Sequence, residues 1–67
     1  MEVISKKSHG VIARSIKGLA VGESVGFDSK VFFWSSIENS RITAGKDIGG
    51  KFTSARLDNI IKVTRID

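Results

Sequence analysis

The most suggestive chemical pattern in the chain is a glycine-rich segment, residues 45–51, with the sequence GKDIGGK. Its spacing of glycine, four residues, glycine and lysine matches the phosphate-binding loop of nucleotide hydrolases. That loop needs Ser or Thr at the next position to hold magnesium, and Phe52 stands there instead. A phosphate loop also leads from a strand into a helix, whereas this segment is expected to follow a helix. We therefore interpret the glycines as a helix end and expect no nucleotide cofactor.

No other catalytic or metal-binding pattern stands out. A hydrolytic site needs a nucleophile beside a base, and the chain offers one histidine, His9, in a terminal segment. The acidic residues are scattered, without a pair suited to general acid and base catalysis. The chain has no cysteine, so neither a disulfide framework nor a Cys/His zinc site is expected. The sequence predicts a protein that is not an enzyme and that uses no cofactor or metal.

Basic residues are the strongest candidates for a binding surface. The chain has 11 Lys and Arg against 7 Asp and Glu, a formal net charge of +4 at pH 7. This balance favours polyanions or acidic protein surfaces as partners. Six cations fall on the predicted main helix and the hairpin after it, and we expect several to share one face: Arg41, Lys46, Lys51, Arg56, Lys62 and Arg65. The alternative, given equal weight, is that they are ordinary solvated residues of a small domain.

Arg41 is a special case, because it falls near the apolar side of the predicted main helix. It is expected to join the cationic face, to pair with an acid such as Asp58, or to lie over the ring of Trp34. Three hydroxyls of the same helix can bond to phosphate oxygens: Ser36, Ser40 and Thr43. Helices and two-stranded ribbons both fit the major groove, so duplex DNA or another polyanion is the favoured ligand.

An aromatic run, Phe32, Phe33 and Trp34, directly follows Val31. Such residues form protein cores more often than they form platforms for stacking bases. Rings left exposed would make a protein-binding or dimerisation hot spot, so these three are the candidate residues of a protein interface. Four large apolar residues in a row cannot all face one side of a strand. At least one of them, with Trp34 as first choice, is expected at a helix start or partly exposed.

The main helix is predicted over residues 35–49. Ser35 and Glu38 match a capping box, and Trp34 precedes the cap, where it can staple to the first turns. The predicted inward side is apolar: Ile37, Ile42, Ala44 and Ile48. The predicted outward side is polar: Glu38, Asn39, Lys46 and Asp47. Gly49 and Gly50 end the helix, one of them in a left-handed conformation.

A hairpin is predicted after the helix, with strands over residues 51–57 and 60–66. Asp58 and Asn59 form its two-residue turn. On the returning strand, one face carries Ile61, Val63 and Arg65, and the other carries Ile60, Lys62, Thr64 and Ile66. Phe52 and Leu57 are an odd number of positions apart, so they point to opposite faces of a regular strand. Either one of them covers the hairpin end or a bulge shifts the register.

The N-terminal third is less sharply patterned. Residues 1–8 are expected to be a loose terminus or to include a short strand. Residues 9–19 read almost equally as helix or strand, and a short helix capped by Ser8 is preferred because Ile12, Ile16 and Leu19 have helical spacing. Residues 24–27 are expected to form a strand with Val25 and Phe27 on one face. The prediction is one small α+β domain, residues 1–67, with the hairpin packed on the main helix.

Four short motifs follow one another over residues 19–66. They are a turn and strand with VGES (Leu19–Val25), a helix with Ser36, Ile37, Ser40, Arg41 and Ala44, a strand with GKF (Gly50–Thr53), and a closing strand with VTRI (Lys62–Ile66). In this pattern the chain resembles a type of short protein common in phage and prophage genomes. The resemblance implies a small regulator or DNA-binding accessory protein with no established active site. The aromatic run and the first 18 residues lie outside it.

Two hypotheses follow. The first is a small, basic, non-enzymatic phage-type protein that binds nucleic acid or acts as a regulator. The alternative is a protein that inhibits or modulates a host factor, such as a polymerase, nuclease or defence complex, through an acidic surface of that factor. The N-terminus lacks the apolar core of a signal peptide and no apolar run is long enough to span a bilayer, so we expect a cytoplasmic protein of the host cell. A domain this small also makes a homodimer plausible.

Overall fold

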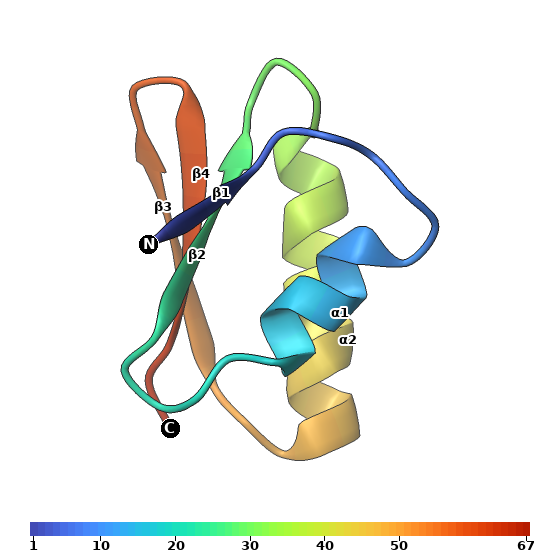
Figure 1. Ribbon diagram of the computed structural model, residues 1–67. Coiled ribbons are helices and arrows are strands. Elements are labelled where there is room, and N and C mark those ends of the chain that lie inside the picture. Colours follow the sequence, from blue (N-terminus) through green and yellow to red (C-terminus); the bar gives the residue numbers. More distant parts are fainter.

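Strands and helices alternate along the chain before it closes with a hairpin. The computed structural model describes all residues, 1–67. Its elements, in order, are β1 (Glu2–Ile4), α1 (Val11–Lys17), β2 (Ser24–Asp28), α2 (Trp34–Ile48), β3 (Phe52–Leu57) and β4 (Ile60–Arg65). The strands form one sheet in the order β1–β2–β4–β3, and both helices lie on one face of it (Figure 1). The predicted α+β class, with a C-terminal hairpin, is confirmed.

The first half is a β1–α1–β2 unit in which β1 pairs parallel to β2. Residues 2–4 are therefore a strand and not a loose terminus. The preferred helix in residues 9–19 is also confirmed, and Ile16 of α1 is fully buried. Ser8 does not cap it through its side chain, because Gly10 occupies the N-cap with φ of 72°. The Ser8 carbonyl instead accepts a hydrogen bond from the Val11 N–H at 3.1 Å.

The core lies between the helices and the inner face of the sheet. Val25 and Phe27 of β2 point into it, as predicted, and so do Ile61 and Val63 of β4. The other core residues come from both helices, their flanking loops and the start of β3: Ile16, Leu19, Phe32, Ile37, Ala44 and Phe52. No buried polar side-chain atom lacks a hydrogen-bond partner. Neither helix is long and apolar enough to cross a membrane.

The start of α2 differs from the prediction. The helix begins at Trp34, with Phe33 at the N-cap and no side-chain cap hydrogen bond, so the capping box of Ser35 and Glu38 is wrong. Trp34 is the first helical residue and does not precede a cap. The Glu38 carboxylate is instead bonded to Arg41 and to Ser54 of β3, so it is directed toward the strand and not back to the helix start.

The buried side of α2 is narrower than predicted. Ile37 and Ala44 are buried, but Ile42 and Ile48 are exposed. Ile42 is turned about 140° from Ile37 around the helix axis, since successive residues advance by about 100°. Ile48 lies in the last turn, at the end of the helix. Glu38 is half-buried against β3 and does not lie away from the sheet.

The end of α2 and the hairpin follow the prediction closely. Gly49 takes the left-handed conformation, with φ of 70°, and ends the helix. Asp58 takes a positive φ of 52° in the hairpin turn. The ladder runs without a bulge from Phe52 opposite Arg65 to Leu57 opposite Ile60. Phe52 therefore faces the helices, while Leu57 lies on the open face of the sheet.

Candidate functional site

The six predicted binding cations divide into groups with different surroundings. Lys62 alternates with the buried Ile61 and Val63, so it lies on the open face of the sheet, away from the helices. Four of the others lie along the side of the molecule where α2 runs beside β3. We call this the α2–β3 surface and define it by the residues Trp34, Glu38, Arg41, Lys46, Lys51, Ser54 and Arg56. The six cations therefore do not form one face.

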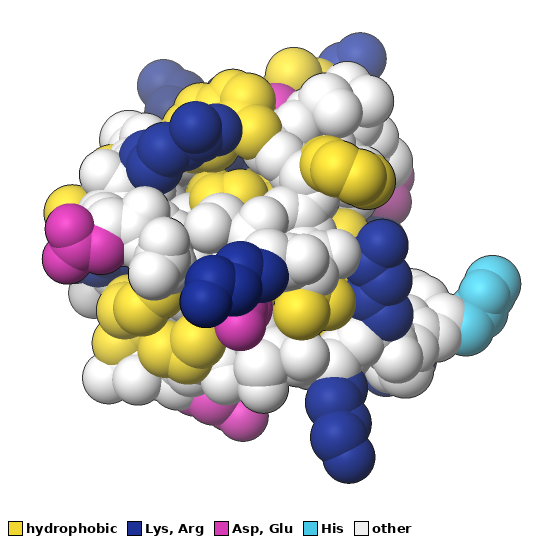
Figure 2. Space-filling model, turned by 90° about the horizontal axis from the view of Figure 1, so that it is seen from above, with side chains coloured by type: hydrophobic (Ala, Val, Ile, Leu, Met, Phe, Trp, Pro, Cys, Tyr) yellow, Lys and Arg dark blue, Asp and Glu magenta, His cyan; other side chains and the backbone are white.

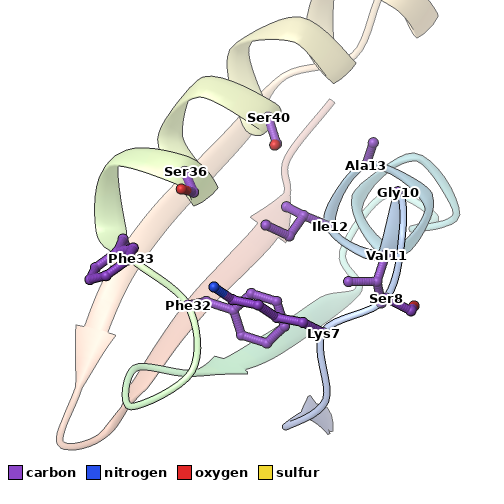
Figure 3. A pocket seen from close by; sticks show the side chains of 10 residues that line it. All are labelled: Lys7, Ser8, Gly10, Val11, Ile12, Ala13, Phe32, Phe33, Ser36 and Ser40. Carbon is purple, nitrogen blue, oxygen red and sulfur yellow. The ribbon is translucent and has the colours of Figure 1, made fainter.

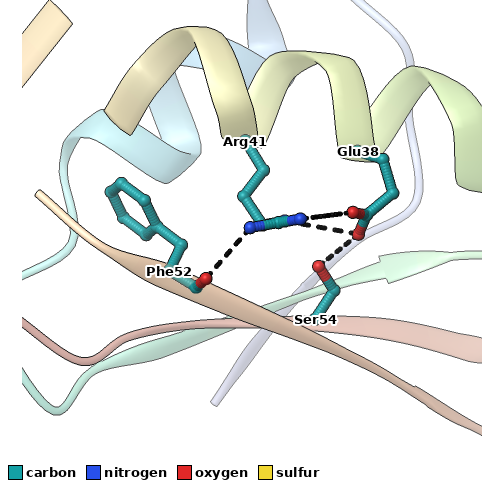
Figure 4. Close-up of polar contacts among 4 residues, drawn as sticks. All are labelled: Glu38, Arg41, Phe52 and Ser54. Atoms are coloured by element: carbon teal, nitrogen blue, oxygen red, sulfur yellow. Dashed lines mark hydrogen bonds and ion pairs between the residues drawn. The ribbon is translucent and has the colours of Figure 1, made fainter. Parts of the chain in front are cut away.

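Arg41 is anchored within the α2–β3 surface (Figure 4). Its Nη2 donates to Glu38 Oε2 at 2.5 Å, and its Nη1 donates to the Phe52 backbone carbonyl at 3.0 Å. The Arg41 and Glu38 side chains are 25% and 22% exposed. Neither Asp58 nor Trp34 is the partner that the sequence led us to expect. Glu38, one turn earlier on the same helix, is in reach because positions i and i+3 are neighbours on a helix surface.

The surroundings of Glu38 hold the pKa of its carboxyl below the ordinary value. The hydrogen bond from Arg41 is the main cause and lowers the pKa of Glu38 below its ordinary value. Partial burial opposes this shift, while the hydrogen bond donated by Ser54 and the positive charge of Arg41 add to it. The carboxylate is therefore ionised at neutral pH, and it links α2 to β3.

Arg65 is likewise committed to the fold. Its Nη1 donates to the Leu19 carbonyl at 3.0 Å, and its Nε donates to the Asp67 carbonyl at 3.2 Å. The first of these bonds joins the end of β4 to the segment between α1 and β2, which is 46 residues away in sequence. Arg65 is half-buried, so its guanidinium acts mainly as a structural cross-link.

Lys46 and Lys51 are the unpaired cations of the α2–β3 surface. The two salt bridges of the protein are Lys17 with Asp47 and Arg41 with Glu38, so neither lysine has an acidic partner. Both are exposed and line a shallow depression of about 420 Å³ at the C-terminal end of α2. Their positive charges are fully available to a ligand.

Arg56 lies at the opposite end of the α2–β3 surface. Its guanidinium carbon is 5.2 Å from the centre of the Trp34 ring. α2 descends in Figure 1 while β3 rises, so the first residue of α2 lies beside the end of β3. Arg56 is exposed, and only its contact with the ring restrains it. Its side chain is therefore restrained less than those of Arg41 and Arg65 and more than those of Lys46 and Lys51.

The three aromatic candidates have different environments. Phe32 is buried, with its ring edge-to-face against Phe27 at 5.4 Å between centroids. Phe33 is 72% exposed and Trp34 is 37% exposed. The expectation that Trp34 is partly exposed at a helix start is confirmed, but Phe33 is the more exposed ring. Phe32 is a core residue and not a surface contact.

Lys7 is a candidate that sequence reasoning missed. Its Nζ is 5.6 Å from the centre of the Phe33 ring. The two residues are far apart in sequence, and no local pattern around Lys7 connects it with the aromatic run. The contact arises because the segment between β1 and α1 passes beside the start of α2 (Figure 3).

A pocket of about 360 Å³ lies between these two segments. Figure 3 shows side chains of α1, α2 and their preceding loops around it. Its walls combine apolar groups, hydroxyls and one cation, from Lys7, Ser8, Gly10, Val11, Ile12, Ala13, Phe32, Phe33, Ser36 and Ser40. The predicted hydroxyl donors Ser36 and Ser40 thus face this pocket and not the lysines at the other end of α2.

Comparison with protein-family models, curated proteins and solved structures found no match to this chain. The resemblance to short phage and prophage proteins therefore remains a prediction from its four motifs.

Proposed function

We propose that this protein is a small, basic, non-enzymatic module that binds nucleic acid, with duplex DNA as its principal ligand. The observation that supports this most strongly is the arrangement of cations without an acidic partner on the α2–β3 surface. Lys46 and Lys51 lie at one end of it and Arg56 lies at the other. As a phage-encoded accessory or regulatory protein, it would act in the cytoplasm of the host cell.

The spacing of these cations suits a duplex. Lys51, just before β3, and Arg56 are five positions apart, a span of roughly 17 Å at about 3.3 Å per residue. The major groove of B-DNA is about 12 Å wide, so cations at this spacing can reach phosphates on both of its sides. Phosphate contacts of this kind position a protein without reading the base sequence. Binding is therefore expected to be similar for different duplex sequences.

Salt dependence tests the proposal. Each phosphate that a cation neutralises releases counterions, so the logarithm of the affinity should fall with the logarithm of salt concentration by about 0.9 per phosphate. We would measure duplex binding by fluorescence anisotropy across a salt series for the wild type and for Lys46→Ala/Lys51→Ala. The double variant should bind more weakly to all sequences alike.

Lys62→Ala is the matched control, because it removes the same charge from the open face of the sheet. If the double variant loses only as much binding free energy as twice the loss caused by Lys62→Ala, binding depends on net charge alone and not on the α2–β3 surface. Binding that is absent at low salt, or that does not change with salt, would rule out the proposal. Sedimentation of the same samples would show whether a monomer or a homodimer binds.

A protein partner is the second candidate function. The observation that favours it is the exposure of Phe33 beside Trp34 and Arg56, since aromatic and arginine side chains are enriched in binding hot spots. Such a protein would modulate a host factor that presents an acidic surface. Affinity capture from host lysate, with and without nuclease, separates the two candidates. A protein retained after nuclease treatment and lost with Trp34→Ala favours this candidate, whereas recovery of nucleic acid alone excludes it.

A further inference from the structure

The start of α2 carries two adjacent aromatic rings, and each is covered by a cation from a different segment. Lys7 lies 5.6 Å from the Phe33 ring and Arg56 lies 5.2 Å from the Trp34 ring. Lys7 belongs to the segment before α1 and Arg56 belongs to β3, so the two rings face different sides of the start of α2. Phe33 faces the segment before α1, and Trp34 faces β3. We call these four residues the aromatic end.

The aromatic end is part of a mixed apolar and cationic surface. Figure 1 places the β2–α2 loop and the hairpin turn at the same end of the molecule, and a hydrogen bond of 2.8 Å from the Ser29 N–H to the Asn59 carbonyl joins them. Figure 2, seen from this end, shows hydrophobic side chains interspersed with Lys and Arg, with most of the acidic side chains toward the rim. This combination suits a ligand with both flat apolar faces and negative charge.

The pocket beside Phe33 narrows the choice of ligand. Val11, Ile12 and Phe32 give it apolar walls, and the hydroxyls of Ser36 and Ser40 supply hydrogen-bonding groups along one side. Its volume, about 360 Å³, lies within the range of small-molecule sites, about 300–1,000 Å³. No acidic residue lines it. A flat ring with polar edges and a nearby negative charge matches these walls, and an unpaired nucleotide has that chemistry.

We propose that the aromatic end binds single-stranded nucleic acid. One base stacks on Phe33 at the mouth of the pocket, where Ser36 and Ser40 can bond to its edge, and the next base stacks on Trp34. Lys7 and Arg56 then bind the phosphates. This inference rests on nucleic acid being the ligand class, as proposed above, but it uses other residues than Lys46 and Lys51.

The energies favour the exchange of ring partners that this requires. Stacking a base on an aromatic side chain stabilises a complex more than an exposed contact between a cation and a ring does. A base can therefore displace the ammonium of Lys7 from the Phe33 ring, and the displaced cation remains close enough to pair with the phosphate. Duplex DNA gains no stacking energy from these rings, because its bases are already stacked on one another.

Trp34 is the sole tryptophan of the chain, so its fluorescence reports directly on the aromatic end. We would titrate the full-length protein with a short oligothymidylate, with a blunt duplex of the same length, and with polyglutamate. The oligothymidylate should quench Trp34 emission saturably, and the duplex should quench it less. Phe33→Leu keeps an apolar side chain at an exposed position and should weaken oligothymidylate binding about tenfold, as expected for the loss of one stacked base.

Matched variants separate this inference from the proposed function. Lys46→Ala/Lys51→Ala should weaken duplex binding more than oligothymidylate binding, and Phe33→Leu should do the reverse. If the duplex binds but Phe33→Leu leaves oligothymidylate binding unchanged, the single-strand inference is wrong and duplex binding stands. Equal quenching by polyglutamate would also overturn it, since a simple anion site needs no base. If neither nucleic acid binds at low salt, both proposals fail.

Discussion

Arg41 and Lys46 carry the same charge on neighbouring turns of α2, but their surroundings are opposite. Arg41 is half-buried and bonds to Glu38 and to the Phe52 carbonyl, whereas Lys46 is exposed and has no acidic partner. The planar guanidinium offers five donors in a fixed arrangement, so it can satisfy several acceptors at once between a helix and a strand. An ammonium is strongly hydrated and stays in water. Counting positive charges therefore overestimates the surface that a polyanion can use.

The first prediction tests the anchored side of this comparison. Arg41→Ala should lower the free energy of unfolding by about 2–3 kcal/mol, because hydrogen bonds to charged groups contribute about 1.5–3 kcal/mol and Glu38 is left half-buried without its cation. For a domain of this size, each kcal/mol corresponds to a fall of about 4–8 °C in Tm. Thermal unfolding followed by circular dichroism measures it. A shift within the error of the wild type would show that Arg41 is not an anchor.

Arg65→Ala should have the next largest effect. It removes two hydrogen bonds to the backbone carbonyls of Leu19 and Asp67, and only the first joins distant parts of the chain. The expected loss is about 1 kcal/mol, the usual net contribution of one hydrogen bond. Urea unfolding measures this loss, and Lys62→Ala, on the open face of the sheet, is the control. A loss no greater than that of Lys62→Ala would mean that Arg65 is as free as the lysines.

The third prediction concerns pH. The folded state lowers the pKa of Glu38, chiefly through Arg41, so the unfolded chain takes up this proton more readily than the folded protein. The contribution of ionised Glu38 to the free energy of unfolding is fully present above the ordinary pKa of 4.5, and it is lost as pH falls through the lowered pKa. The stability of the wild type should therefore fall on acidification below about pH 4.5, and the stability of the Glu38→Gln variant should fall less steeply. Unfolding midpoints from pH 7 to pH 2 measure the slopes, and identical slopes would contradict the prediction.

The free lysines should show the smallest effect on stability. Lys46→Ala/Lys51→Ala should change the free energy of unfolding by about 0.5 kcal/mol or less, as is usual for surface substitutions without partners. In the same variant, the slope of the logarithm of duplex affinity against the logarithm of salt concentration should become shallower by about one for each lysine removed. Denaturant unfolding and binding measured on one preparation test both statements. A large loss of stability would show that the lysines, like Arg41, are part of the fold.

Local chemistry made the end of α2 and the inward faces of β2 and β4 predictable. The paired glycines end α2 because Gly49 adopts a left-handed conformation that other residues rarely take. Alternation of side chains along a strand placed Val25, Phe27, Ile61 and Val63 correctly in the core. These features depend on neighbours in sequence. The capping box failed because Arg41 and Ser54 compete for the Glu38 carboxylate, and Ser54 reaches it only through the packing of β3 on α2.

The sequence by itself determined the α+β class, the hairpin, the helix end and the surplus of cations, since each follows from residue type and short-range spacing. Only the tertiary structure decided which cations are free, which aromatic ring is exposed and what lies beside it. Arg65 bonds to a carbonyl 46 residues away, and Lys7 contacts Phe33 across the space between two segments. The physical reason is that hydrogen bonds and ring contacts act over a few ångströms. Which groups come that close depends on how the helices pack on the sheet.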